Sequence, residues 1–268
     1  MTAVRISALL AALAIMTAPA MAEETVLLHA AGSLRTALSE VAKDFEAAGS
    51  AKVQAKFGAS GLLKDEIAGG AKAEVFASAN MEHPQALAAA KRSGPVVLFA
   101  RNRLCALVRP GLDVTPASLL DRMLDPKVKL GTSTPKADPS GDYAWEVFRK
   151  AEKINAGAYA ALEKKALQLT GGPTSPPAPQ GRSVYGELIA RGEADIFLTY
   201  CTNALAAQRE NPAQAIVQLP DALAVGADYG MTVMNGASVP AYQFALFILS
   251  EGQRTLARHG FAAPGLSP

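Results

Sequence analysis

The chain of 268 residues is nearly neutral, with 26 Lys and Arg against 24 Asp and Glu, and half of its residues are apolar. This balance argues against nucleic-acid binding and against a polybasic membrane surface, since both need a clear excess of cations. The apolar share is ample for a large core, and the length suits one large domain or two lobes.

The N-terminus has the features of a secretory signal peptide. A single cation, Arg5, precedes an apolar run over residues 6–16, and Ala20-Met21-Ala22 fits the small-x-small pattern at a cleavage site. The apolar run is too short to span a membrane. We therefore predict that residues 1–22 are removed on export and that the mature protein is periplasmic.

Strands and helices alternate through the first part of the mature chain. Two stretches, 26–34 and 53–62, each show a strand, a short loop and a serine where a helix should start. Apolar residues at helical spacing predict helices over 34–45 and 62–67. A strand over 74–78 and a helix over 84–92 follow.

The same alternation continues after residue 100. Thr115 is the expected cap of a helix that has Pro116 at its first position, and a Pro-rich loop spans 171–181. The remaining expected strands are 103–109, 128–132, 167–170, 195–200, 215–219 and 229–234. The remaining expected helices are one from about Ser140, those over 156–167 and 183–191, and two at the C-terminus.

This pattern predicts an α/β protein of two lobes, each a mostly parallel sheet flanked by helices. We expect residues 23–100 and 226–268 to form the first lobe and residues 101–225 to form the second. Ligands of such sheets bind beyond the carboxyl ends of the strands. The predicted ligand site is therefore the cleft between the lobes.

Ser33 and Ser60 are the first candidate ligand-binding residues. Each would offer its hydroxyl and nearby backbone N–H groups at the positive end of a helix, where an anion is favoured. The alternative is that both serines are simply helix N-caps.

Four segments together resemble the periplasmic molybdate-binding proteins of ABC importers, over essentially the whole mature chain. They are Ala31-Gly32-Ser33-Leu34, Gly58-Ala59-Ser60-Gly61-Leu62, the strand over 73–79 and the C-terminal stretch over 247–261.

The resemblance implies a periplasmic solute-binding protein that captures molybdate, and tungstate as well, for an ABC permease. It also implies a monomer without cofactor, without metal other than as molybdate, and without enzymatic activity. The oxyanion would be held by neutral groups, namely the hydroxyls of Ser33, Ser60 and Tyr200 and the backbone amides of Ser140 and Val184. The Pro-rich loop over 173–181 and the cation Arg182 depart from the family pattern. A pocket of donors alone would bind phosphate weakly, because it lacks an acceptor for the phosphate proton.

Other functions stay open at this point. The same fold could bind another oxyanion or a small organic anion. A secreted hydrolase using Ser33 or Ser60 is a rival, although no G-x-S-x-G motif is present. The effector domain of a transcription regulator shares the architecture, but the signal peptide argues against it.

Cys105 and Cys201 are the only two cysteines. In an oxidising periplasm they could form a disulfide. Two buried, inert thiols are the alternative.

Overall fold

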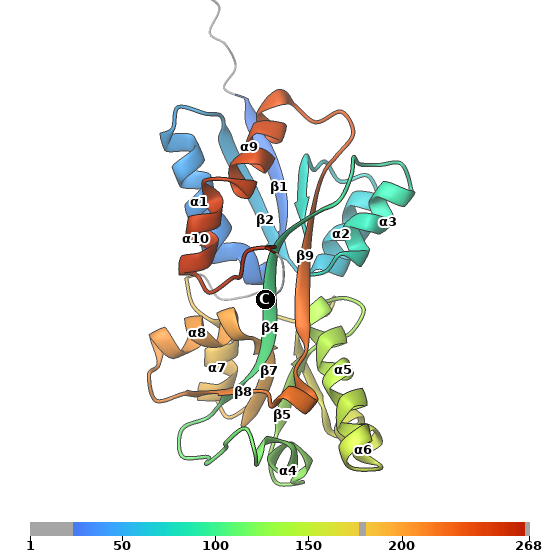
Figure 1. Cartoon of the computed structure of the whole chain (residues 1–268), viewed down its shortest axis with the longest axis vertical. Coiled ribbons are helices and arrows are strands. Elements are labelled where there is room, and N and C mark those ends of the chain that lie inside the picture. Colours follow the sequence, from blue (N-terminus) through green and yellow to red (C-terminus); the bar gives the residue numbers. More distant parts are fainter. Residues whose placement is uncertain (1–23, 177–180, 266–268) are drawn as a thin grey trace, which may run out of the picture.

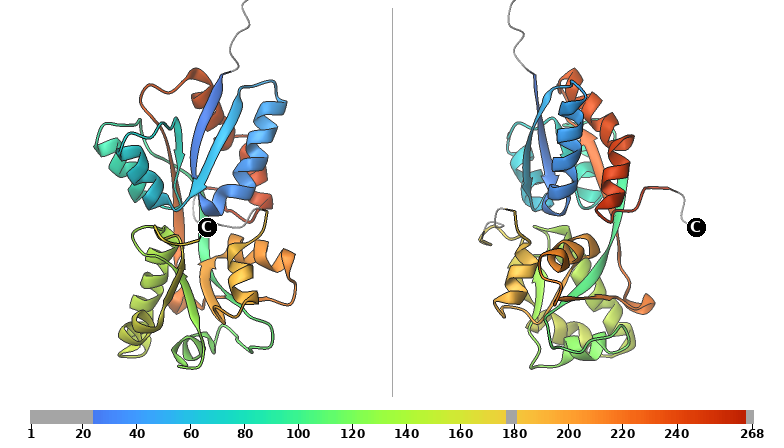
Figure 2. Two further views of the ribbon diagram at one scale, coloured as in Figure 1. Left: turned by 180° about the vertical axis from the view of Figure 1, so that it is seen from behind. Right: turned by 90° about the vertical axis from the view of Figure 1, so that its left-hand side faces the viewer.

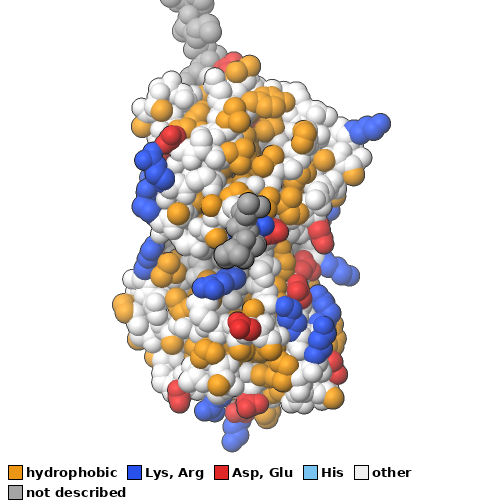
Figure 3. All heavy atoms as spheres, in the orientation of Figure 1, with side chains coloured by type: hydrophobic (Ala, Val, Ile, Leu, Met, Phe, Trp, Pro, Cys, Tyr) orange, Lys and Arg blue, Asp and Glu red, His pale blue; other side chains and the backbone are white. Residues whose placement is uncertain are grey.

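The computed structural model describes residues 24–176 and 181–265, and it has two lobes stacked along the long axis (Figure 1). The space-filling view narrows at mid-height, between the lobes (Figure 3). The predicted signal peptide lies outside the described residues. No helix within the described ranges is both long and apolar enough to cross a membrane.

The first lobe is built on strand β1 (Thr25–Ala31), which runs parallel to β2 (Lys52–Gly58) and β3 (Val75–Ala77). Helix α1 (Arg35–Ala47) buries the apolar face that its sequence predicts, and its Phe45 contacts Phe244 and Phe247 of α9 (Val239–Leu249) with ring centroids 5.1 and 5.5 Å apart. The helices of this lobe are α1 (Arg35–Ala47), α2 (Ser60–Ala68), α3 (Glu82–Ala89), α9 (Val239–Leu249) and α10 (Gly252–Arg258).

Two long strands pass between the lobes, β4 (Val97–Val108) and β9 (Gly226–Val233) (Figure 1). They pair antiparallel from Val97 to Arg103 of β4, and β9 also pairs with β3. The second half of β4 pairs with β7 (Ile196–Tyr200) and β8 (Ala215–Gln218). The strand order is therefore β2-β1-β3-β9-β4-β7-β5-β6, with β8 beside β4.

In the second lobe, β5 (Leu130–Ser133) runs parallel to β6 (Leu167–Thr170) and β7. Helices flank these strands on both sides (Figure 2). They are α4 (Leu119–Leu124), α5 (Pro139–Ile154), α6 (Ala158–Lys165), α7 (Val184–Ala190) and α8 (Cys201–Glu210). The predicted α/β architecture with two lobes is confirmed. The division of the chain at residues 100 and 225 stays a prediction.

Two sequence expectations for residues 97–119 are wrong. Strand β4 begins at Val97 rather than at residue 103, because its first half pairs with β9 in the other lobe. Thr115 does not cap a helix. Its side chain and that of Ser118 bond each other in a separate turn, and α4 begins only at Leu119.

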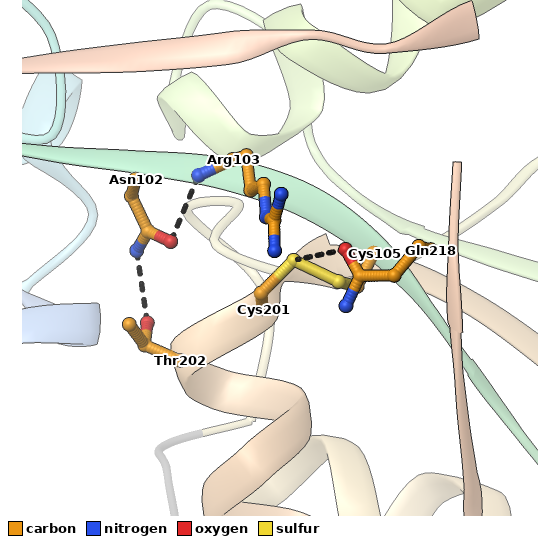
Figure 4. Close-up of a disulfide and its surroundings, with 6 residues drawn as sticks. All are labelled: Asn102, Arg103, Cys105, Cys201, Thr202 and Gln218. Carbon is orange, nitrogen blue, oxygen red and sulfur yellow. Dashed lines mark hydrogen bonds between the residues drawn. A yellow bond between two sulfur atoms is a disulfide. The ribbon is translucent and has the colours of Figure 1, made fainter. Parts of the chain in front are cut away.

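The two cysteines form a disulfide between β4 and the first residue of α8 (Figure 4). Cys105 is fully buried, and the two Cα atoms are 4.8 Å apart, within the range that a disulfide requires. Cys201 directly follows Tyr200, so the bond fixes the end of β7 against β4. Of the two possibilities that the sequence leaves open, the structure therefore has the disulfide and not two inert thiols.

Candidate functional site

A small cavity of about 40 Å³ lies between the lobes, where the carboxyl ends of β1, β2 and β7 meet. A single water needs roughly 10–15 Å³, so the cavity has room for about three waters or a small anion. Residues of both lobes line it: Ala31, Gly32, Ser33, Gly58, Ala59, Ser60, Ala79, Asp138, Tyr185 and Tyr200. We call it the inner cavity.

Ser60 is the first residue of α2, and its side chain is buried. The N-cap position belongs to Ala59, and no side chain caps this helix. The Ser60 hydroxyl instead accepts a hydrogen bond of 3.1 Å from the Ala79 amide. Because that bond occupies a lone pair and not the proton, Ser60 can still donate to a ligand. The helix-cap interpretation of Ser60 is therefore wrong.

Ser33 lies in a 3-10 turn (Gly32–Leu34) directly after β1, and it also caps no helix. A chain of hydrogen bonds reaches it from β4 and β9, the two strands that pass between the lobes. The Asn102 amide donates to the Tyr229 hydroxyl at 3.3 Å, and that hydroxyl lies 3.0 Å from Ser33 Oγ. Either hydroxyl can donate in this second bond, and when Tyr229 donates, the Ser33 proton is left for a ligand.

Asn102 is itself held in one orientation, as Figure 4 shows. Its Oδ1 accepts from the Arg103 amide at 2.9 Å, and its Nδ2 donates to Thr202 Oγ1 at 2.9 Å. These bonds fix which end of the side-chain amide faces Tyr229.

Tyr200 ends β7 and lines the inner cavity, with only 2% of its surface exposed. Its hydroxyl has no hydrogen-bond partner within the described part of the chain. Burial raises the pKa of this phenol well above its usual value, so the group is a neutral donor. A buried hydroxyl without a partner is costly, and a ligand acceptor in the cavity would remove that cost.

The two expected backbone donors are placed differently. The Ser140 amide donates at 3.0 Å to Asp138 Oδ1, which caps α5, so this N–H is already engaged. Val184 begins α7 and lines a neighbouring cavity rather than the inner one. The structure thus brings together Ser33, Ser60 and Tyr200, and it leaves Ser140 and Val184 outside the inner cavity. Their contact with a ligand stays a prediction.

Asp138 is a lining residue that the sequence analysis did not select. Loss of solvent raises the pKa of its carboxyl to about 6, although the hydrogen bonds from the Ser140 amide and the Ser133 hydroxyl lower it. Tyr185, at the second position of α7, lines the same cavity. The lining of the inner cavity thus includes a carboxyl, which the expectation of a pocket of donors alone did not contain.

Asp138 could have been recognised from Asp138-Pro139, since Asp at the N-cap and Pro at the first helical position mark a helix start. A helix start after a strand of this sheet faces the cleft. No comparable signal marks Tyr185, which reaches the cavity through the packing of α7.

The lobes also touch through their backbones beside the inner cavity. The Gly61 amide of α2 donates at 2.9 Å to the carbonyl of Ala137 in the second lobe. A Cβ at Gly61 would lie 2.4 Å from the carbonyl oxygen of Lys136 and 2.7 Å from that of Ala137. Only glycine allows this approach.

A larger outer cavity of about 410 Å³ adjoins the inner one and shares Gly32, Ser33 and Tyr185 with it. Arg35, Arg182 and Arg209 line it together with Val184 and His259. The Arg182 guanidinium pairs with Glu187 at 2.8 Å and is largely exposed. The cations therefore lie around the outer cavity, and none lines the inner one. Four residues of the Pro-rich loop, 177–180, lie outside the described residues.

The geometry disfavours a serine nucleophile. Ser33 bonds the Tyr229 hydroxyl and Ser60 bonds the Ala79 amide, and no histidine of the described chain hydrogen-bonds to either serine. An activated serine needs an adjacent general base. Within the same residues, no group of three or more His, Cys, Asp or Glu side chains is placed to hold a metal ion.

Comparison with known proteins decides the family. The family model for bacterial extracellular solute-binding proteins matches residues 26–262. The chain belongs to this family. A solute-binding protein of this kind serves an ABC transporter, and a cleft between two lobes is where it would hold its solute.

Two relatives are similar to this chain over most of its length. An uncharacterized protein of Pasteurella multocida is 34% identical over 211 residues, which are 78% of this chain and 87% of that protein. The molybdate-binding protein ModA of Mycobacterium tuberculosis is 25% identical over 259 residues, covering 92% of this solute-binding protein and 87% of ModA.

Two solved structures show that the fold is shared with anion-binding proteins. The periplasmic molybdate-binding protein of Azotobacter vinelandii has a TM-score of 0.72 at 16% identity, over 90% of this chain and 100% of that one. The sulfate-binding protein SubI of Mycobacterium tuberculosis has a TM-score of 0.71 at 17% identity, over 90% and 87%.

Proposed function

We propose that this solute-binding protein captures a tetrahedral oxyanion, molybdate and also tungstate, in the inner cavity and delivers it to the permease of an ABC importer. The observation that carries the proposal is the convergence of Ser33, Ser60 and Tyr200 from two lobes on one small cavity. The unpartnered Tyr200 hydroxyl supports it further. The 25% identity to ModA supports the choice of molybdate. The protein would act in the periplasm and perform no covalent chemistry.

Hydrogen bonds can supply the affinity that such a site needs. Each hydrogen bond to a charged partner contributes roughly 1.5–3 kcal/mol net of desolvation, so three converging hydroxyls would contribute roughly 5–9 kcal/mol to binding. Since Ser60 and Tyr200 lie on different lobes, the anion contacts more donors when the lobes are closed. Anion binding therefore favours the closed state.

Titration calorimetry of the mature protein with molybdate, tungstate, sulfate and phosphate tests the proposal. Molybdate and tungstate are nearly equal in size and should bind alike. Sulfate is smaller and should bind more weakly, because packed lobes resist the further closure needed to reach it. Sulfate binding as tight as that of molybdate would contradict the molybdate assignment.

Ser60→Ala is expected to weaken oxyanion binding by about ten- to a hundredfold, which corresponds to one lost hydrogen bond to a charged ligand. Because Ser60 caps no helix, its removal should cost little stability beyond the bond to the Ala79 amide. Calorimetry gives the affinity and thermal unfolding gives the stability. Ser39→Ala, on α1 and outside both cavities, is the control. Unchanged affinity in both Ser60→Ala and Ser33→Ala would remove these serines from the site.

A small organic anion is the second candidate ligand. The adjoining outer cavity, with its three arginines, has space for the body of such a molecule, while its anionic group occupies the inner cavity. Tight binding of an organic phosphate or carboxylate, with no binding of the inorganic oxyanions, would favour this alternative.

A further inference from the structure

A carboxyl group in a cavity built for an anion needs a chemical explanation. Asp138 lines the inner cavity together with Ser33, Ser60 and Tyr200. The hydroxyls of these three residues can donate hydrogen bonds to an anion. An ionised Asp138 would repel a dianion held by these donors, since the low dielectric of a closed cleft strengthens the repulsion. Either the charge of Asp138 is neutralised on binding, or an anion binds poorly.

Within the described part of the chain, no Lys, Arg or His lines the inner cavity beside Asp138, and Lys136, two residues away, acts on Asp142; the positive end of the α5 dipole is the one favourable charge at this carboxyl. Its own helix carries Asp142, whose negative charge makes ionisation of Asp138 less favourable. Tyr185 on α7 and Tyr200 at the end of β7 face it as neutral phenols, and Ser133 on β5 donates a hydrogen bond. The segment after β6 contributes Gly171, at which a Cβ would lie 2.4 Å from Asp138 Oδ2.

The charged groups of the cleft lie farther out. Arg35, Arg182, Arg209, Glu210 and His259 line the outer cavity, and none of them lines the inner one. His259 is paired with Glu40 at 2.8 Å. Among the described residues no cation lines the inner cavity, and the α5 dipole supplies only about half an elementary charge, so a proton is needed to neutralise Asp138 fully.

We propose that the inner cavity binds its oxyanion together with one proton, which lies between a ligand oxygen and the Asp138 carboxyl. The inference rests on the proposed function and adds a ligand class to it. An anion that carries its own proton, such as hydrogen phosphate, brings what the site needs. Molybdate, tungstate and sulfate carry none near neutral pH, so the protein must take up a proton from water when it binds them.

The proposal sets the sign of the pH dependence. Below about pH 6, the pKa of Asp138, the carboxyl is already protonated and the affinity for molybdate should be constant. Above that value the affinity should fall by up to about tenfold for each pH unit, because each binding event then requires a proton. Hydrogen phosphate should not show this fall at alkaline pH.

The experiment is calorimetric titration of the mature protein with molybdate, sulfate and phosphate between about pH 6 and about pH 9, in buffers of different ionisation enthalpy. The dependence of the heat on the buffer counts the protons taken up. At alkaline pH, we expect close to one proton with molybdate or sulfate and close to none with phosphate.

Asp138→Asn is the decisive variant, because asparagine caps a helix as well as aspartate and keeps the side-chain shape. It should bind molybdate at about pH 8 tens of fold more tightly than the wild type, with no proton uptake and no fall in affinity toward higher pH. In His259→Gln, the affinity for molybdate should still fall as the pH rises. This control would exclude His259 as the source of the pH dependence.

The outcomes separate this inference from the proposed function. Binding of molybdate or sulfate to the wild type with one affinity at all pH values and no proton uptake would overturn the inference alone. If the affinity of Asp138→Asn for molybdate still falls toward alkaline pH, the inference about the shared proton is overturned as well. Failure of all these anions to bind either protein would contradict the oxyanion function and the inference with it.

Discussion

Replacing Gly61 with alanine is expected to weaken oxyanion binding about tenfold or more while the protein remains folded. The added Cβ would meet the backbone carbonyls of Lys136 and Ala137 at 2.4 and 2.7 Å, so the second lobe must move away. That movement breaks the bond from the Gly61 amide and takes Tyr200 away from a ligand held by Ser60. Since alanine favours a helix more than glycine does, α2 itself should not be weakened.

Calorimetry and small-angle X-ray scattering together test the Gly61→Ala variant. The affinity should fall, and the ligand should produce a smaller decrease in radius of gyration than in the wild type. Gly226→Ala is the matched control, because its Cβ would meet no atom within 4 Å. Wild-type affinity and wild-type scattering in Gly61→Ala would show that the closed contact at Gly61 does not contribute to binding.

Removal of the disulfide is expected to produce the largest loss of stability. The bond joins residues separated by 96 positions, and a loop of that length corresponds to about 4–5 kcal/mol on the entropic model. For a protein of this size, the melting temperature should fall by about 10–15 °C. Guanidinium unfolding with and without a reducing agent measures the effect.

The Cys105→Ala/Cys201→Ala double variant is the control for the disulfide prediction. Its unfolding midpoint should match that of the reduced wild type and should not respond to the reducing agent. Thiol titration of the denatured, unreduced wild type should find no free thiol. Two free thiols, or a midpoint that reduction leaves unchanged, would contradict the prediction.

The sequence predicts those features of the site that depend on local order. Ser33 and Ser60 each come two residues after the end of a strand, and parallel pairing of β1 and β2 brings the ends of both strands to one edge. Tyr200 is itself the last residue of β7. The rest depends on contacts between distant segments, such as Ser33 with Tyr229, 196 residues away. The periodicity of apolar residues along the sequence does not predict such a contact.

Asp138 illustrates a different limit of sequence analysis. The Asp-Pro pair signals only a helix start, and capping alone is a sufficient reason for an aspartate there. Its second role depends on the cavity, which exists only when the lobes meet. The predicted start of α4 is too early for a local reason. The side chains of Thr115 and Ser118 bond each other and form a separate turn before the helix.

The position of β9 has a consequence for biosynthesis. This strand lies between β3 and β4 in the sheet, although it is the last strand in the chain. A nascent polypeptide that lacks residues 226–233 cannot complete the sheet of the first lobe, and such long-range pairing slows folding. Folding is thereby postponed until almost the whole chain has been synthesised. If residues 1–22 direct export as predicted, the delay keeps the polypeptide unfolded during its passage through the translocation channel.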